Sequence, residues 1–232
     1  MPSSAPSAKE ILAKLVSFDT VSHKTNIPMA EWIRDYLKDQ GVAATMLPAD
    51  DGIHTNLYAT IGPEGVSGVA LSGHMDVVPV VGQDWETDPF TMVERDGKLY
   101  GRGTTDMKGY LACVLAAVPE FKRRKLSVPI HIAFSYDEEV GCTGVRPMID
   151  ELGKSLPKPR MVLVGEPTSM RVVDAHKGGA RWRVDIKGRA VHSSVAPLGV
   201  NTITYAAKII GELHRMEEEL KAKPNPRFDP PH

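Results

Sequence analysis

Histidine and carboxylate residues recur at four places in this 232-residue sequence, each directly after an expected strand or in a loop that follows one. The first place holds His74 and, two positions later, Asp76. A neutral imidazole is a good zinc ligand, and alternate residues of an extended chain point to the same side. Asp76 can therefore accept the second ring N–H of His74, which fixes the tautomer of the ligand and raises its basicity. A His–Asp pair on the surface is the alternative interpretation.

The second place is the run Gly-Arg-Gly-Thr-Thr-Asp-Met-Lys-Gly at 101–109. Its glycines allow the backbone to approach a bound group closely. Asp106 stands directly before an expected helix, where a carboxylate often serves as the N-cap. A carboxylate that bridges two metal ions is the functional alternative.

The third and fourth places add further carboxylates. Asp137, Glu138 and Glu139 follow an apolar strand, and three adjacent acids repel one another unless a cation compensates them or one pKa is raised. Adjacent glutamates can divide the work, one binding metal and the other handling protons; a solvated acidic turn is the alternative. Glu166 follows the next apolar run and, taken alone, is equally typical of the entry to a helix.

Together these residues predict a metal site. Nitrogen and oxygen ligands without thiolates suit zinc, and also cobalt or manganese. Two ions that share a carboxylate, roughly 3.5–4 Å apart, can activate a water and polarise a carbonyl group.

The expected elements must bring the four places together. Apolar residues at helical spacing and short, β-branched apolar runs alternate along the chain. This order predicts an α/β fold with a mostly parallel sheet and flanking helices, and ligands of such sheets bind at the carboxyl ends of the strands. The expected helices are 8–18, 28–41, 107–124 and 201–221, and the expected strands are 55–61, 68–72, 128–135, 161–164, 172–175 and 181–186.

Composition indicates the compartment and excludes some partners. The formal net charge is -1, so no strong global field draws nucleic acid or an acidic membrane. The first residues lack the apolar stretch of a secretory signal, and no apolar run approaches the roughly 20 residues that span a bilayer. Two cysteines provide no disulfide framework and suit a reducing compartment. We therefore expect a cytoplasmic protein that binds neither nucleic acid nor membrane.

The motifs His-x-Asp, Gly-Arg-Gly-x-x-Asp-Met-Lys-Gly, Asp-Glu-Glu and Gly-Glu-Pro-Thr together resemble the zinc aminoacylase and carboxypeptidase family over nearly the whole chain. The resemblance implies two zinc ions, with cobalt or manganese possible, and a small N-acyl amino acid as substrate. It also implies a zinc-binding catalytic domain in 1–176, a smaller α+β dimerisation domain in 177–232, and a cis peptide bond after Asp106. The implied roles are one zinc held by His74 and Glu166, a second held by Glu139, a bridging Asp106, proton transfer by Glu138 and orientation of His74 by Asp76.

His192, in the run 188–194, matches a further motif of the family. In relatives this histidine reaches the active site of the other subunit and stabilises the tetrahedral oxyanion. The resemblance therefore implies a homodimer in which His192 acts across the interface. Without the resemblance, an exposed loop histidine is the preferred interpretation.

Within the family, the segments 134–142, 175–178 and 199–201 are most similar to acetylornithine deacetylases, with succinyl-diaminopimelate desuccinylases as the nearest alternative. Relatives are longer, and after the smaller domain they complete the sheet and supply a last zinc-ligand histidine. The resemblance thus implies a truncated N-terminal part with little or no activity alone. A non-catalytic binding or oligomerisation module is the alternative of another class.

Overall fold

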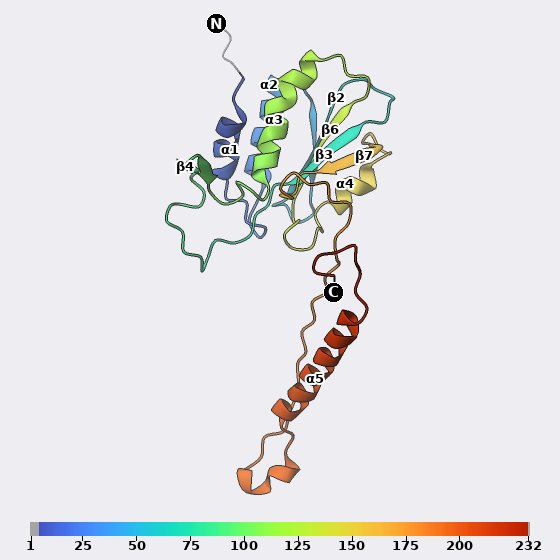
Figure 1. Ribbon diagram of the computed structural model, residues 1–232. Coiled ribbons are helices and arrows are strands. Elements are labelled where there is room, and N and C mark those ends of the chain that lie inside the picture. The colour runs from blue at the N-terminus through green and yellow to red at the C-terminus, as the bar shows by residue number, and fades with distance from the viewer. Residues whose placement is uncertain (1–4, 232) are drawn as a thin grey trace. The chain divides into compact units, whose positions relative to one another are not determined.

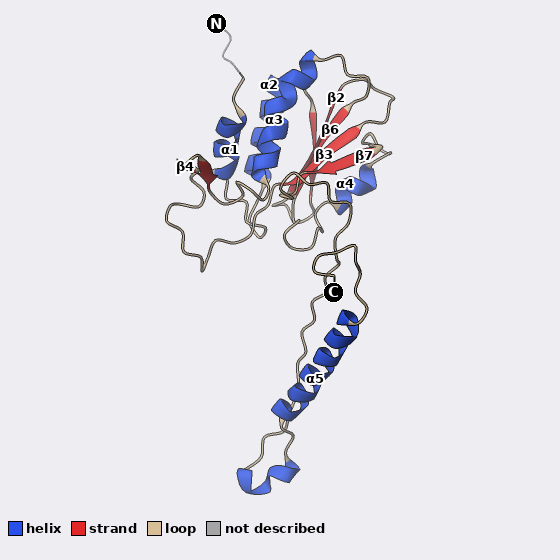
Figure 2. Cartoon of the chain, in the orientation of Figure 1, coloured by secondary structure: helices blue, strands red, loops and turns tan. Residues whose placement is uncertain are grey.

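The computed structural model describes residues 5–231, and the chain divides into two compact units, one that ends at Met170 and one that begins at Arg171. Figure 1 traces the elements of both units, and Figure 2 separates helix, strand and loop. The first unit contains a five-stranded sheet in the order β1-β2-β6-β3-β7 and a separate hairpin of β4 and β5. The strands are β1 (Ala44–Pro48), β2 (Thr55–Ile61), β3 (Val69–His74), β4 (Val93–Arg95), β5 (Lys98–Tyr100), β6 (Ile130–Ser135) and β7 (Met161–Val164).

The expected α/β class is confirmed, and the sheet itself is mixed. β3 runs parallel to both β6 and β7, whereas β2 runs antiparallel to both β1 and β6. In the parallel part, His74 lies opposite Ser135 and Ser72 lies opposite Val164. The segments that follow β3, β6 and β7 therefore leave the sheet at one edge, as required for the predicted convergence.

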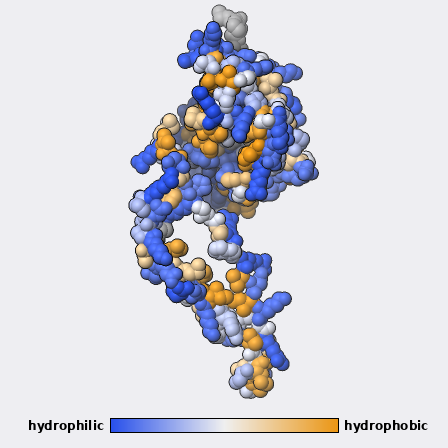
Figure 3. All heavy atoms as spheres, turned by 90° about the vertical axis from the view of Figure 1, so that its right-hand side faces the viewer, coloured by the Kyte–Doolittle hydropathy of each residue, from blue (hydrophilic) through white to orange (hydrophobic). Residues whose placement is uncertain are grey.

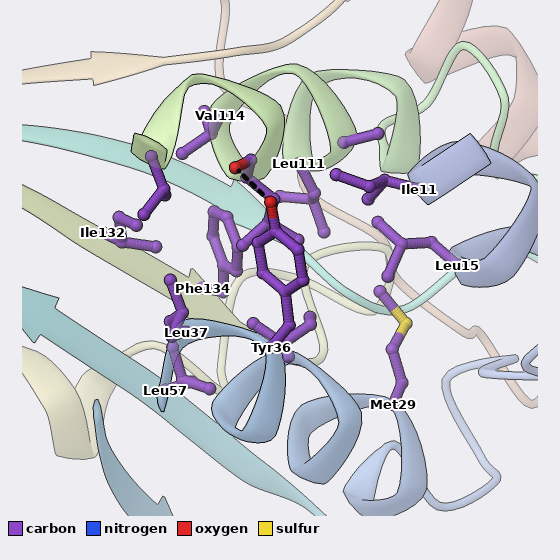
Figure 4. Close-up of a cluster of buried hydrophobic side chains, with 14 of the residues drawn as sticks. Ile11, Leu15, Met29, Tyr36, Leu37, Leu57, Leu111, Val114, Ile132 and Phe134 are labelled. Atoms are coloured by element: carbon purple, nitrogen blue, oxygen red, sulfur yellow. Dashed lines mark hydrogen bonds between the residues drawn. The ribbon is translucent and has the colours of Figure 1, made fainter. Parts of the chain in front are cut away.

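Helices cover the sheet of the first unit, and its larger core lies between the sheet and three of them (Figure 4). The helices of this unit are α1 (Ala8–Val16), α2 (Ile27–Asp39), α3 (Lys108–Arg123) and α4 (Arg146–Glu151). The buried side chains of α1, α2 and α3 meet those of β2 and β6, among them Leu57 and Phe134. Tyr36 donates its hydroxyl proton to the carbonyl of Leu115 at 3.1 Å, which ties α2 to α3 within the apolar layer.

The opposite face of the sheet carries a smaller apolar cluster. Tyr58 and Ala133 point to this side and contact Met148 of α4 and Leu156. Alternate residues of a strand point to opposite faces, so Leu57 and Phe134 serve the first core while Tyr58 and Ala133 serve the second. The sheet is therefore held between two apolar layers.

In the second unit, the expected long helix is α5 (Thr202–Lys221), preceded by the 3-10 turn η1 (Ser193–Leu198). The prediction of strands at 172–175 and 181–186 was wrong, because neither segment pairs with another strand. A strand needs a hydrogen-bonded neighbour, and within the described part of this unit only Arg189 and Val200 form a bridge. Many apolar side chains of the unit are exposed, such as those of Val172 and Ile203. Figure 3 shows apolar patches on the surface of the molecule.

No described helix combines the length and the apolar character that are needed to cross a lipid bilayer.

Candidate active site

His74 ends β3 and is the centre of the candidate site. Its side chain is only 1% exposed, and Nδ1 lies 2.9 Å from the backbone carbonyl oxygen of Asp76 and 3.4 Å from its carboxylate. A proton on Nδ1 is shared with these acceptors, so Nε2 is the ring nitrogen left for a ligand. The sequence analysis predicted that Asp76 orients His74; the structure places Asp76 next to Nδ1, with the backbone oxygen of Asp76 as the nearest acceptor.

Nε2 of His74 faces three carboxylates that come from different segments. It lies 3.0 Å from Oδ1 of Asp106, 3.7 Å from Oε1 of Glu166 and 3.9 Å from Oε2 of Glu138. Ligand atoms of His74, Asp106 and Glu139 all lie within 4.8 Å of one another, and so do those of His74, Glu138 and Glu166. The structure thus brings together all five residues that the sequence predicted at the metal and the proton-transfer step.

Asp106 is positioned by the turn that precedes α3. The peptide bond between Asp106 and Met107 is cis, as predicted. The helix begins at Lys108, with Met107 at the N-cap and no side-chain capping bond. The N-cap interpretation of Asp106 is therefore wrong, and its carboxylate lies at the imidazole of His74 instead.

Glycine at position 73 allows α3 to approach β3 next to His74. A Cβ added to Gly73 would lie 2.7 Å from Cδ2 of Leu111 and 2.8 Å from Cε of Met107. The segment of Met107 is also the one that carries Asp106, so the close approach of strand and helix sets the separation of two site residues.

Asp76 contacts more groups than His74 alone. Its buried carboxylate accepts the hydroxyl proton of Ser22 at 2.7 Å and the backbone N–H groups of Glu138 and Glu139 at 3.1 and 3.3 Å. Burial disfavours its charge, but the bonds from His74 and Ser22 outweigh this and lower the pKa of Asp76. The sequence analysis missed Ser22, which is 54 positions away and belongs to no recognisable motif.

The charges of the cluster are unbalanced without a cation. Burial opposes a charged His74 ring, but the hydrogen bond and charge of Asp76 and the charge of Glu166 prevail and raise the pKa of His74 to about 9. Burial and the charge of Asp106 raise the pKa of Glu139 to about 7, and burial together with Asp106 and Glu138 raises the pKa of Glu166. These shifts mark carboxylates that repel one another, and one imidazole among several carboxylate oxygens is a donor set that fits a divalent metal ion.

His192 belongs to the second unit, apart from the residues above in sequence. It is exposed at the start of η1, where Nδ1 accepts the N–H of Ser194 at 3.2 Å. A neutral ring then carries its proton on Nε2. His192 can donate a hydrogen bond from that nitrogen.

Comparison with known proteins assigns the family. The sequence profile of peptidase family M20/M25/M40 matches residues 70–226, a range that includes His74 and the carboxylates around it. The chain belongs to this family. Its members are metal-dependent hydrolases, in keeping with the donor set around His74.

Individual relatives of the M20/M25/M40 family agree with this assignment. The chain is 35% identical over 225 residues to the acetylornithine deacetylase of Pasteurella multocida (strain Pm70), covering 94% of this chain and 58% of that protein. Human carnosine dipeptidase 1 is 27% identical with a TM-score of 0.59, covering 68% of this chain and 37% of the other. The M20 family metallo-carboxypeptidase Sso-CP2 of Sulfolobus solfataricus shares the fold at 22% identity, with a TM-score of 0.62 and coverage of 69% and 37%. The chain therefore spans little more than half the length of the deacetylase.

Proposed function

We propose that the protein acts as an acetylornithine deacetylase, which hydrolyses N2-acetyl-L-ornithine to ornithine and acetate in arginine biosynthesis. The observation that carries the hydrolase assignment is the convergence of His74 with Asp106, Glu138, Glu139 and Glu166 at one edge of the sheet. The choice of substrate rests on the 35% identity to the deacetylase. The proposed location is the cytoplasm, and the free thiols of both cysteines are compatible with a reducing compartment.

The proposed metal ligands are His74, Asp106, Glu139 and Glu166. In this proposal His74 and Glu166 would hold one zinc ion, Glu139 would hold a second, and Asp106 would contribute to both; cobalt or manganese could replace zinc. Bound metal would supply the acidity that makes water a nucleophile at neutral pH and would polarise the amide carbonyl.

Glu138 is proposed to move the proton in this reaction. Water adds to the amide carbon, Glu138 takes its proton, and the C–N bond breaks as Glu138 passes that proton to the leaving amine. Asp76 holds the His74 ring throughout, through the contacts to Nδ1.

His192 is proposed to stabilise the oxyanion that develops on the carbonyl oxygen, acting from the other subunit of a homodimer. The Nε2–H of its neutral ring is the group that would donate to this oxygen. The substrate is a small N-acyl amino acid, and the proposal includes no nucleic-acid or membrane partner.

Replacing Glu138 in the complete protein tests the assignment. In Glu138→Ala we expect turnover of N2-acetyl-L-ornithine to fall by about 10²- to 10⁴-fold, the usual contribution of a positioned acid–base group. Metal content, measured by atomic emission, should stay that of the wild type. The matched control is Glu64→Ala, which removes an exposed carboxylate in the loop between β2 and β3.

Two outcomes would count against the proposal. Wild-type turnover in Glu138→Ala would remove the proton-transfer role. Faster release of amine from N-succinyl-diaminopimelate or from a dipeptide than from N2-acetyl-L-ornithine would support the hydrolase assignment but contradict the proposed substrate. A dipeptide is included among the test substrates because the chain is 27% identical to a dipeptidase.

A further inference from the structure

The segment 18–22, between α1 and α2, lies against the loop that follows His74. Thr20 donates its hydroxyl proton to the carbonyl of Met75 at 2.6 Å. The backbone N–H of Val77 donates to the carbonyl of Thr20, and the N–H of Ser22 donates to the carbonyl of Val77, at 3.0 and 3.2 Å. The two segments thus run side by side, joined by hydrogen bonds on both sides of Asp76.

Two further contacts fix the ends of this segment. At its start, the buried Nζ of Lys108 donates a hydrogen bond to the carbonyl of Phe18 at 2.7 Å, which joins the segment to the first turn of α3. At its end, Nε2 of His54 lies 2.9 Å from the carbonyl oxygen of Ser22. The backbone of Ser22 is therefore held from several directions, and its hydroxyl has a defined place.

The hydroxyl of Ser22 points at the least exposed carboxylate of the site. Ser22 is 7% exposed and donates to Oδ2 of Asp76 at 2.7 Å, while Asp76 is 1% exposed. The same carboxylate receives the backbone N–H groups of Glu138 and Glu139 and lies against the His74 ring. Any rotation of the Asp76 carboxylate would disturb the imidazole and the acidic pair together.

We propose that Ser22 is a positioning residue of the metal site, which acts by fixing the Asp76 carboxylate so that His74, Glu138 and Glu139 keep their relative places. The part of the proposal that concerns metal rests on the proposed function. Removing a group that hydrogen-bonds to a metal-ligating side chain and orients it commonly weakens metal binding strongly. Such changes are typically about 10- to 100-fold. Ser22 contacts Asp76 rather than His74 itself, so its effect on metal affinity should be about tenfold.

Amide exchange in the metal-free chain tests the positioning itself. In Ser22→Ala we expect the backbone amides of Glu138 and Glu139 to exchange with solvent about fivefold faster, an effect of the size of one lost hydrogen bond. Ser22→Thr keeps the hydroxyl and should keep the wild-type exchange rates. Unchanged rates in Ser22→Ala, or equally raised rates in both variants, would overturn the proposal.

Metal affinity tests the consequence for the site. Titration with Co²⁺ against a chromophoric chelator should give a Kd about tenfold weaker in Ser22→Ala than in the wild type, with a changed visible Co²⁺ spectrum and rescue by Ser22→Thr. The matched control is Tyr58→Phe, which also removes one hydroxyl hydrogen bond, that from Tyr58 to the carbonyl of Pro157. Tyr58 lies in the smaller apolar cluster with Met148 and Leu156, among none of the site residues. Tyr58→Phe should lower the urea midpoint without changing the Kd.

The two experiments separate this inference from the proposed function. A wild-type chain that binds no Co²⁺ refutes the metal site, while the exchange rates still decide the role of Ser22. A wild-type chain that binds Co²⁺, with the same Kd in Ser22→Ala, refutes the role of Ser22 and leaves the proposed function standing.

Discussion

His54 is a buried histidine whose two ring nitrogens both lie against oxygen acceptors. Nδ1 is 2.5 Å from the carboxylate of Asp51, and Nε2 is 2.9 Å from the carbonyl oxygen of Ser22 and 3.0 Å from that of Lys24. A neutral imidazole has a single N–H, so only the charged ring can donate to both sides. Burial opposes that charge, but the bond to Asp51 and the charge of Asp137 outweigh it and raise the pKa of His54.

The raised pKa makes the contribution of His54 to stability depend on pH. Because the folded pKa lies above the unfolded value, the contribution is complete below about pH 6.5 and is lost as the pH rises through the folded pKa. We expect His54→Gln to lower the free energy of unfolding by about 1–3 kcal/mol at pH 6 and by less at pH 8.5, as measured by urea unfolding. His23→Gln, at an exposed position, should change little at either pH. An effect of His54→Gln that grows with pH would contradict the charged-ring assignment.

At the residue scale, the sequence predicted the residues that meet at the candidate site and the Asp76 contact to His74, but not the further residue that holds Asp76. His74, Asp106, Glu139 and Glu166 could be found because a chemically distinctive side chain stands at the end of each apolar run. Ser22 could not, because serine is common and its partner is 54 positions away. Its role depends on two loops that meet only in the folded chain.

At the scale of elements, the contact between β3 and α3 determines the shape of the site. We expect Gly73→Ala to lower the free energy of unfolding by about 1–3 kcal/mol, the usual effect of overpacking a tight contact. The added Cβ would clash with the side chains of Leu111 and Met107. The clash should also push α3 away from β3, and because His74 is the residue after Gly73, this displacement should weaken Co²⁺ binding. Urea unfolding and Co²⁺ titration measure the two effects. Gly178→Ala is the control, since no atom lies within 4 Å of its added Cβ; equal behaviour of the two variants would show that the contact is loose.

Elements with a clear periodic pattern of apolar residues were predicted well. Elements whose formation depends on contacts with other parts of the chain were not. The strands at 55–61 and 161–164 appear as expected in β2 and β7, and α5 lies within the expected helix. β1 and α4 were missed because half-buried strands and short helices carry little periodicity. The segments 172–175 and 181–186 have strand-like composition but no ladder partner among the described residues, so pattern alone gave the wrong result there.

At the scale of the whole molecule, protonation of the site and folding are coupled. Folding raises the pKa of Glu139 from 4.5 to about 7 and that of His74 from 6.5 to about 9. Through these two groups the folded state binds more protons than the unfolded chain, so their contribution to stability falls as the pH rises. The Glu139 part is lost between about pH 4.5 and 7, and the His74 part between about pH 6.5 and 9.

Metal ions should reverse this dependence. In chelator, the urea midpoint of the chain should fall from pH 5 to 7. Above pH 7 the loss from His74, at most about 3.5 kcal/mol at about 1.4 kcal/mol per pKa unit, is opposed by Lys108, because burial lowers the pKa of Lys108 to about 7. With saturating Co²⁺ the midpoint should be higher and should rise with pH toward neutrality, because the ion binds neutral imidazole and ionised carboxylates and stabilises the state that holds it. His74→Ala should make the metal-free midpoint rise above about pH 7, because the Lys108 contribution is then unopposed, and should remove most of the Co²⁺ effect. A metal-free midpoint that is flat or rises between pH 5 and 7 would contradict the coupling, because Glu139 would then titrate in the folded chain as it does in the unfolded one.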